Sequence, residues 1–150
     1  MSHDTALQAG HLPLLNEIRA TYDRAKKGIE YCQKGLKLTR RFPVDLPVVK
    51  GYHAAFKMVQ ASHELFPWAK ITVFEEGKRL MEKQVGRAPA NLEIRFLRLS
   101  IQLNAPSLLG YTQHIKADQQ FLSQHFPDCT DPDLRHVLNT FLAQHPAIRL

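Results

Sequence analysis

Two groups of histidines and cysteines have spacings that could support a metal site. His63-Glu64 begins like the HExxH signature of zinc proteases, but Pro67 stands where the second histidine ligand must be. His125, Cys129 and His136 span a predicted turn and lack a convincing fourth ligand. We therefore expect no metal, and we interpret His63 as a histidine at the edge of the core.

One pair of residues has a spacing suited to acid–base chemistry. His114 and Asp118 are four residues apart, so on a helix the carboxylate could orient the imidazole. No nucleophile accompanies them, and an ordinary hydrogen bond along the helix is the favoured interpretation. The chain also has no GxSxG, GxGxxG or GxxxxGK[ST] motif, so we predict no catalytic residue and no cofactor.

The segment 92–103 is the element that must position the remaining polar candidates. As a helix it has two apolar faces: Leu92, Phe96, Leu99 and Leu103 lie on one, and Ile94, Leu97 and Ile101 lie nearly opposite. Such a helix has no face that is fully exposed to solvent. We expect it to be the most enclosed helix of an all-helical domain.

Polar side chains occupy the two seams between these apolar faces. Glu93 lies on one seam, and Arg95, Arg98 and Gln102 lie on the other. Enclosed arginines require an anionic or carbonyl partner, and we predict that Arg98 pairs with Asp118 of the following helix. The seam is interpreted as structural, with a small anion pocket, or an enzyme using these polar groups, as alternatives.

The net charge of +6 is concentrated near the N-terminus, where residues 12–41 hold eight Lys or Arg and three acids. If this segment is one helix, one flank carries Arg19, Lys26, Lys27, Lys34, Arg40 and Arg41. Such a basic face could bind nucleic acid, another anion or an acidic lipid surface. A solvated or protein-facing stripe is the simpler reading.

Apolar spacing and proline-containing turns predict the order of elements. Leu15, Ile18, Tyr22, Ala25, Ile29, Cys32 and Leu36 follow the 3,4 spacing of a straight first helix. Thr21, Gly28 and Gly35 form a small-residue flank that predicts a closely packed neighbour. Further helices are expected at about 49–66, 68–85, 92–103, 107–126 and 132–142, with Ile71 and Leu108 on buried faces and Asp45, Asn91 and Asp131 as N-caps.

These elements predict an all-α fold. We expect one domain over residues 12–145, with five to six antiparallel helices in a bundle or an irregular, tetratricopeptide-like (TPR-like) hairpin array, and tails at 1–11 and 146–150. The two cysteines, Cys32 and Cys129, are expected to be free and reduced. No run approaches the length of a membrane span and no secretory signal is recognisable, so a cytoplasmic location is the default expectation.

One segment also resembles a known family. Residues 91–102, followed by Asn104, Pro106, Leu109, Tyr111, Ile115 and Asp118, are similar to a family of small all-helical bacterial proteins of the Bacteroidetes type with no established activity. The similarity covers roughly residues 54–126. It implies a helical fold and a bacterial source, and it transfers no site residue.

For function, the sequence favours a non-enzymatic helical interaction or scaffold module that binds a protein partner or itself. This expectation rests on the missing catalytic motifs. Nucleic-acid or anion binding through the basic face is the first alternative, and an enzyme using the polar seam is the second.

Overall fold

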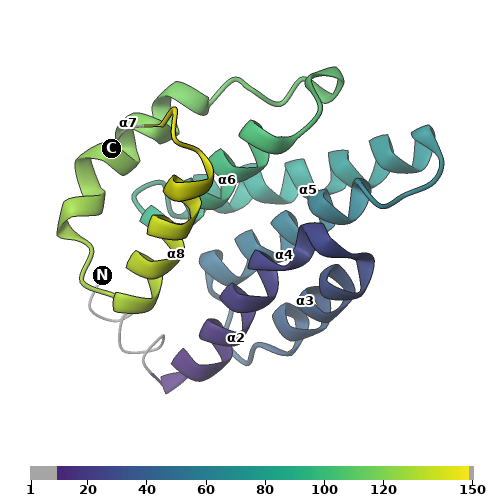
Figure 1. The fold of residues 1–150 in the computed structure, drawn as a ribbon. Helices are drawn as coiled ribbons and strands as arrows, with labels where there is room; N and C mark the ends of the chain where they lie inside the picture. The colour runs from purple at the N-terminus through teal and green to yellow at the C-terminus, as the bar shows by residue number, and fades with distance from the viewer. Residues whose placement is uncertain (1–9, 149–150) are drawn as a thin grey trace. The chain divides into compact units, whose positions relative to one another are not determined.

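The computed structural model describes residues 10–148, and every regular element in that range is a helix. The predicted all-α class is confirmed, whereas the predicted five to six helices are too few, because this range contains seven α-helices. The chain divides into two compact units, which meet in sequence at Arg87 and Ala88, and each unit is described by itself (Figure 1). Of the predicted tails at 1–11 and 146–150, residues 1–9 and 149–150 lie outside the described residues.

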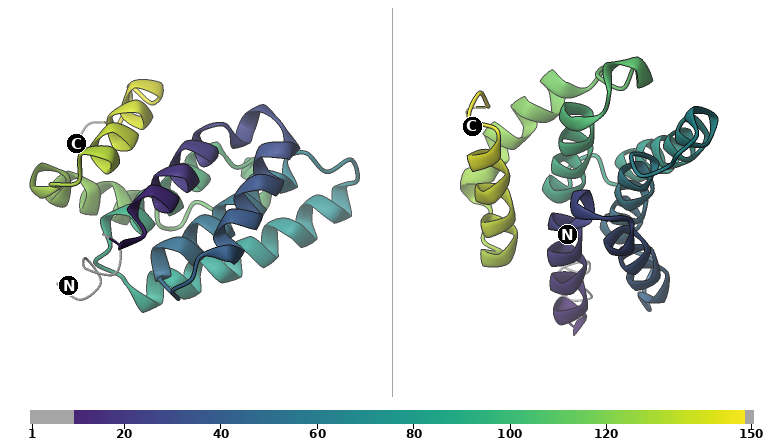
Figure 2. Two further views of the ribbon diagram at one scale, coloured as in Figure 1. Left: turned by 90° about the horizontal axis from the view of Figure 1, so that it is seen from below. Right: turned by 45° about the vertical axis from the view of Figure 1, so that its right-hand side comes forward.

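The first unit is a small helical bundle with α4 at its centre (Figure 2). Its elements are α2 (Leu12–Asp23), the 3₁₀ turn η1 (Ala25–Lys27), α3 (Ile29–Arg41), α4 (Pro47–Ala61) and α5 (Pro67–Arg87). Helix α4 contacts α2, α3 and α5, and ten of its 15 residues are buried. Its apolar residues therefore supply most of the core of this unit.

Glycines allow two helices to approach α4 closely. At Gly35 of α3, an added Cβ would overlap the ring of Phe56, so the predicted close neighbour of the small-residue flank is present. At Gly77 of α5, a Cβ would lie 2.6 Å from Cγ of Met58 and 2.9 Å from the backbone oxygen of Ala54. Both contacts require a residue without a side chain.

The prediction of one straight helix over residues 12–41 is wrong. The chain leaves the α-helical path after Asp23, forms the η1 turn, and passes through an extended Gly28 before α3 begins. The turn buries Ala25 completely, and the backbone oxygen of Ala25 accepts hydrogen bonds from Cys32 Sγ (3.5 Å) and His63 Nε2 (3.2 Å). These tertiary contacts offset the lost helical hydrogen bonds, and they leave Ile29 exposed rather than on an apolar seam.

The connection between α4 and α5 also differs from expectation. Helix α4 ends at Ala61, five residues before the predicted stop at Phe66, and Ser62 Oγ donates to the backbone oxygen of Val59 (2.6 Å) at this end. Helix α5 then begins at Pro67 and continues past Gly86, the predicted terminator. The intervening residues form a turn that carries apolar side chains.

The second unit consists of α6 (Leu92–Asn104), η2 (Ser107–Leu109), α7 (Ile115–His125), η3 (Phe126–Asp128) and α8 (Pro132–Gln144). The predicted N-caps Asn91 and Asp131 are confirmed. The predicted N-cap Asp45 is wrong, because Leu46 is the N-cap of α4 with no side-chain bond, and Asp45 pairs instead with Lys50 (3.3 Å) and Arg87 (3.1 Å). The Asn91 side chain accepts from the backbone nitrogen of Ile94 (3.0 Å), and Asp131 accepts from those of Asp133 (3.0 Å) and Leu134 (3.2 Å). These bonds satisfy donors that a helix start leaves unpaired.

The enclosure of α6 matches its two-faced sequence pattern, since nine of its 13 residues are buried. Helix α4 is enclosed to a similar degree. The next helix departs from the prediction, because α7 starts at Ile115 instead of near Ser107. Gly110 interrupts the path with a φ of 64°, and Leu108, expected in the core, is 91% exposed.

Candidate functional site

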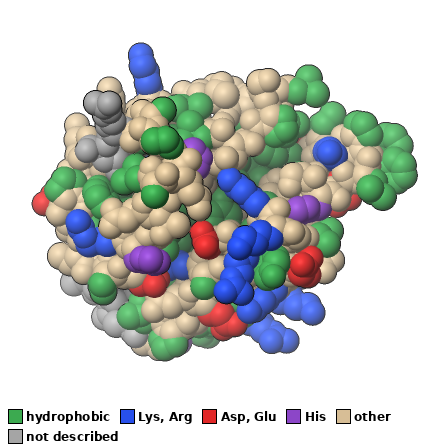
Figure 3. Space-filling view, viewed as in Figure 1, with side chains coloured by type: hydrophobic (Ala, Val, Ile, Leu, Met, Phe, Trp, Pro, Cys, Tyr) green, Lys and Arg blue, Asp and Glu red, His purple; other side chains and the backbone are tan. Residues whose placement is uncertain are grey.

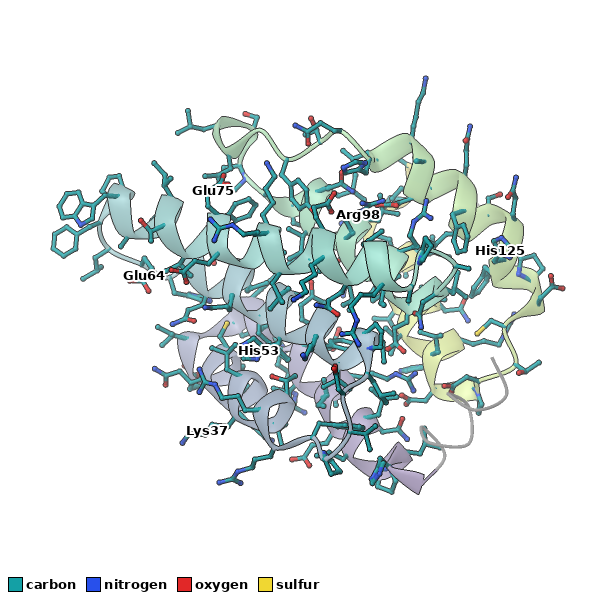
Figure 4. The ribbon with its side chains drawn as sticks, turned by 180° about the vertical axis from the view of Figure 1, so that it is seen from behind. Lys37, His53, Glu64, Glu75, Arg98 and His125 are labelled. Carbon is teal, nitrogen blue, oxygen red and sulfur yellow. The ribbon has the colours of Figure 1, made fainter. Side chains whose placement is uncertain are left out.

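The buried carboxylate of Asp118 gathers most of the predicted polar seam. Arg98, labelled in Figure 4, donates to it through Nε and Nη2. The two distances are 2.8 Å and 2.7 Å, so the predicted pair is present in bidentate form. Arg95 Nε donates at 2.7 Å and Gln102 Nε2 at 3.0 Å. Asp118 is fully buried in the first turn of α7, so this cluster joins α6 to α7.

The outer members of the cluster make further bonds. Gln102 Oε1 accepts from the backbone nitrogen of His114 (2.8 Å), which fixes the start of α7. Arg95 donates to the backbone oxygens of Pro89 (2.9 Å) and Ala117 (3.3 Å), and its guanidinium lies over the Phe121 ring at 4.4 Å. The guanidinium of Arg95 is thereby held on several sides.

This geometry favours a structural role for the seam. Every oxygen of the Asp118 carboxylate accepts at least one hydrogen bond, and the carboxylate has no exposed surface with which to meet a substrate. A surface depression of about 230 Å³ in this unit is lined by Lys116, Gln119, Gln120 and Ser123 instead. Glu93, on the opposite seam of α6, is buried as well.

The histidines whose spacing could suit a metal site make other contacts. Within residues 10–148, no three His, Cys, Asp or Glu side chains come together as a metal site. His63 bonds to the Ala25 backbone, and the ring of His125 lies against Phe121 with centroids 4.2 Å apart. Both cysteines are free, and burial together with the charge of Glu30 raises the pKa of Cys32 to about 11.

The predicted basic face does not form one stripe, because its helix is broken. Arg19 is buried, and its Nη1 donates to Asn16 Oδ1 (3.1 Å). Lys34 Nζ lies 3.6 Å from Glu17 Oε1. The remaining cations separate into Lys26 and Lys27 on η1, and Arg40 and Arg41 at the other end of α3.

A different feature stands out on the surface of the first unit, namely the turn between α4 and α5. Four large apolar side chains are exposed within seven residues: Leu65 (88%), Phe66 (54%), Trp68 (66%) and Ile71 (50%). We call this set the apolar tip. Figure 3 shows hydrophobic side chains gathered at this end of the hairpin. The prediction that Ile71 faces the core is wrong, because α5 extends beyond its neighbours at this point.

The apolar tip has a defined conformation. The rings of Phe66 and Trp68 stack with centroids 4.7 Å apart and planes 14° from parallel. The backbone oxygen of Phe66 accepts from the nitrogen of Lys70 (3.1 Å), and that of Trp68 accepts from Thr72 Oγ1 (2.9 Å). The backbone around the two rings is thus hydrogen-bonded, and the rings contact each other on the surface.

The η1 turn lies at the same end of the first unit as the apolar tip (Figures 1 and 2). The hydrogen bond from His63 to Ala25 ties the two turns together, and Lys26 and Lys27 follow Ala25 directly. Arg24 and Lys70 are also exposed at this end, and the nearby acids are Asp23, Glu30, Glu64 and Glu75. Residues 10–87 as a whole carry 15 Lys or Arg and eight Asp or Glu, so the net charge of the first unit is positive.

Comparisons of the chain with protein-family models, with curated proteins and with solved structures find no match. The predicted kinship with a bacterial family therefore stays a prediction. No helix within residues 10–148 has both the length and the apolar character needed to cross a membrane.

The sequence contains a signal for the apolar tip that helical periodicity does not reveal. Leu65-Phe66-Pro67-Trp68 is a run of apolar residues at a proline, where a turn is expected and turns are ordinarily polar. The helical spacing places Phe66 on a buried seam at the end of the second predicted helix. As part of a turn, the run instead indicates an exposed apolar surface.

Proposed function

We propose that this chain is a non-enzymatic interaction module that engages its partner through the apolar tip. The observation that carries the proposal is the exposure of four large apolar side chains at one turn. Exposed apolar clusters of this kind mark interaction sites in soluble proteins, whereas single exposed apolar residues are commonplace.

The packing of the rest of the first unit supports this choice. The core positions of α4, such as Tyr52 and Phe56, are fully buried, so the unit does not need the apolar tip for its own core. Keeping Phe66 and Trp68 in water has a free-energy cost that a partner would remove. The buried Asp118 cluster supports a catalytic reading less well, because its carboxylate is enclosed.

Two leucines with nearly equal exposure provide a matched test. Leu65 belongs to the apolar tip and is 88% exposed, whereas Leu108 stands on η2 of the second unit and is 91% exposed. We expect Leu65→Ser to shift the protein toward its free form. The variant should therefore sediment more slowly than the wild type in gentle lysates of cells that naturally make the protein. Leu108→Ser leaves sedimentation unchanged.

A double variant, Phe66→Ser with Trp68→Ser, extends the test, and circular dichroism verifies that each variant keeps its helical content. We expect the double variant to sediment as the free 17.2 kDa chain. Sedimentation of the double variant identical to that of the wild type would contradict the proposal.

A further inference from the structure

The area of the apolar tip is that of a small interaction surface. Large apolar side chains have on the order of 150–250 Å² of surface, so the four exposed fractions amount to roughly 500 Å². A stable protein–protein interface buries about 800 Å² on each partner, and a little over half of that area is apolar. The area therefore does not choose between a protein and a lipid surface, and the choice rests on the chemistry of the tip and its neighbours.

The chemistry of the apolar tip suits the boundary between water and lipid. Tryptophan and phenylalanine are amphipathic or apolar rings of the kind that anchor proteins at that boundary, and Leu65 and Ile71 add aliphatic area. The turn is convex and ends a helical hairpin, so its side chains can enter a fluid layer without a preformed pocket. No backbone unfolding is required for this entry.

The lysines beside the apolar tip favour anionic lipid surfaces over zwitterionic ones. Lys26 and Lys27 are exposed on η1, which the His63 to Ala25 bond holds next to the α4–α5 turn. Lysines within a Debye length, about 10 Å, of an anionic membrane contribute to binding. Apolar insertion and headgroup attraction would therefore act at the same end of the unit.

We infer that the first unit docks on anionic membrane surfaces, with Phe66 and Trp68 entering the interface while Lys26 and Lys27 contact lipid phosphates or other anionic headgroups. This inference rests on the proposed function and names the partner as a lipid surface. Docking of this kind is peripheral and needs no membrane-spanning helix. A protein pocket is the competing occupant.

The single tryptophan of the chain, Trp68, lies in the apolar tip and reports on docking directly. The full chain is titrated with vesicles of phosphatidylcholine alone, or of phosphatidylcholine and phosphatidylglycerol in a 7:3 ratio. With the anionic vesicles we expect a blue shift of Trp68 emission and protection from acrylamide quenching. Zwitterionic vesicles bind at least tenfold more weakly.

Two variants that each remove two charges separate headgroup attraction from net charge. Lys26→Gln with Lys27→Gln should weaken binding to anionic vesicles about 10- to 30-fold, since each lysine near the surface contributes roughly three- to fivefold. Arg40→Gln with Arg41→Gln, about 18 Å away along the 13 residues of α3, should change it less than twofold. Equal effects of the two variants would overturn the placement of the headgroup contacts.

The remaining outcomes distinguish this inference from the proposed function. Unchanged Trp68 emission with anionic vesicles overturns membrane docking. If Leu65→Ser still alters sedimentation in cells, the proposed function stands with a protein as occupant. A blue shift that depends on protein concentration without vesicles would instead identify a second copy as the occupant and overturn the inference.

Discussion

Replacing Asp118 by asparagine should strongly destabilise the second unit. The substitution keeps the shape of the side chain but removes the charge, and it turns an NH₂ group toward donors of Arg95, Arg98 or Gln102. Four hydrogen bonds converge on this fully buried carboxylate, from Arg95 Nε, Arg98 Nε and Nη2, and Gln102 Nε2. Two arginines would lose their shared anion.

The magnitude follows from the burial of the pair. Breaking a buried ion pair by removing one partner costs about 3–5 kcal/mol. Asparagine retains one acceptor oxygen, so we expect the low end, about 3 kcal/mol. With a urea m-value of about 1–2 kcal/mol/M, the unfolding midpoint should fall by roughly 1.5–3 M.

Urea titration followed by circular dichroism at 222 nm measures this loss, because the second unit contains no tryptophan. Asp128→Asn, at an exposed carboxylate of η3, is the matched control and should stay within about 0.5 kcal/mol of the wild type. Arg98→Gln combined with Asp118→Asn should cost less than the sum of the two single changes, because the two side chains share bonds. A loss below about 0.5 kcal/mol for Asp118→Asn would contradict a stabilising role for the Asp118 charge.

Two further predictions concern the first unit. Gly77→Ala should destabilise the first unit by about 1–2 kcal/mol in the same urea assay, because the new Cβ would overlap α4. Gly86→Ala, with open space around it, should stabilise the unit by up to about 1 kcal/mol. Equal effects at the two positions would contradict the close packing of α4 and α5. Burial, with the charges of Arg40 and Lys57, lowers the pKa of His53 from 6.5 to about 4, so protonation favours the unfolded chain and stability should fall as the pH decreases from 6.5 toward 4. After allowance for partial exposure of the ring, we expect a loss of about 2 kcal/mol over this range, and His53→Gln should flatten the profile; an equally steep profile in that variant would assign the loss to other groups.

Local chemistry made several features of this chain predictable. Asn91 and Asp131 cap helices as expected, because a capping side chain acts within three residues of its own position. The Arg98–Asp118 pair could be anticipated because an enclosed arginine requires an anion, and Asp118 lay on the next apolar helix. The caps depend on residues close together in sequence, and the ion pair is required because the arginine is buried.

Other features depended on contacts between distant residues. The spacing from Leu15 to Leu36 fits a straight helix, yet the bonds that Ala25 receives from Cys32 and His63 favour a break. Ile71 fits the apolar face of α5, yet nothing in a periodic pattern reveals that α5 extends past its neighbours there. Periodicity identifies which face is apolar, and only the packing determines where along the helix that face is covered.

We propose that the apolar tip is the surface through which this chain acts. Photo-crosslinking can test this contact, with a photoreactive phenylalanine analogue placed at position 65 or, as the matched control, at position 108 in cells that naturally make the protein. We predict adducts to protein or lipid from position 65 in clear excess over position 108. Equal yields from the two positions, or none from position 65, would contradict the account.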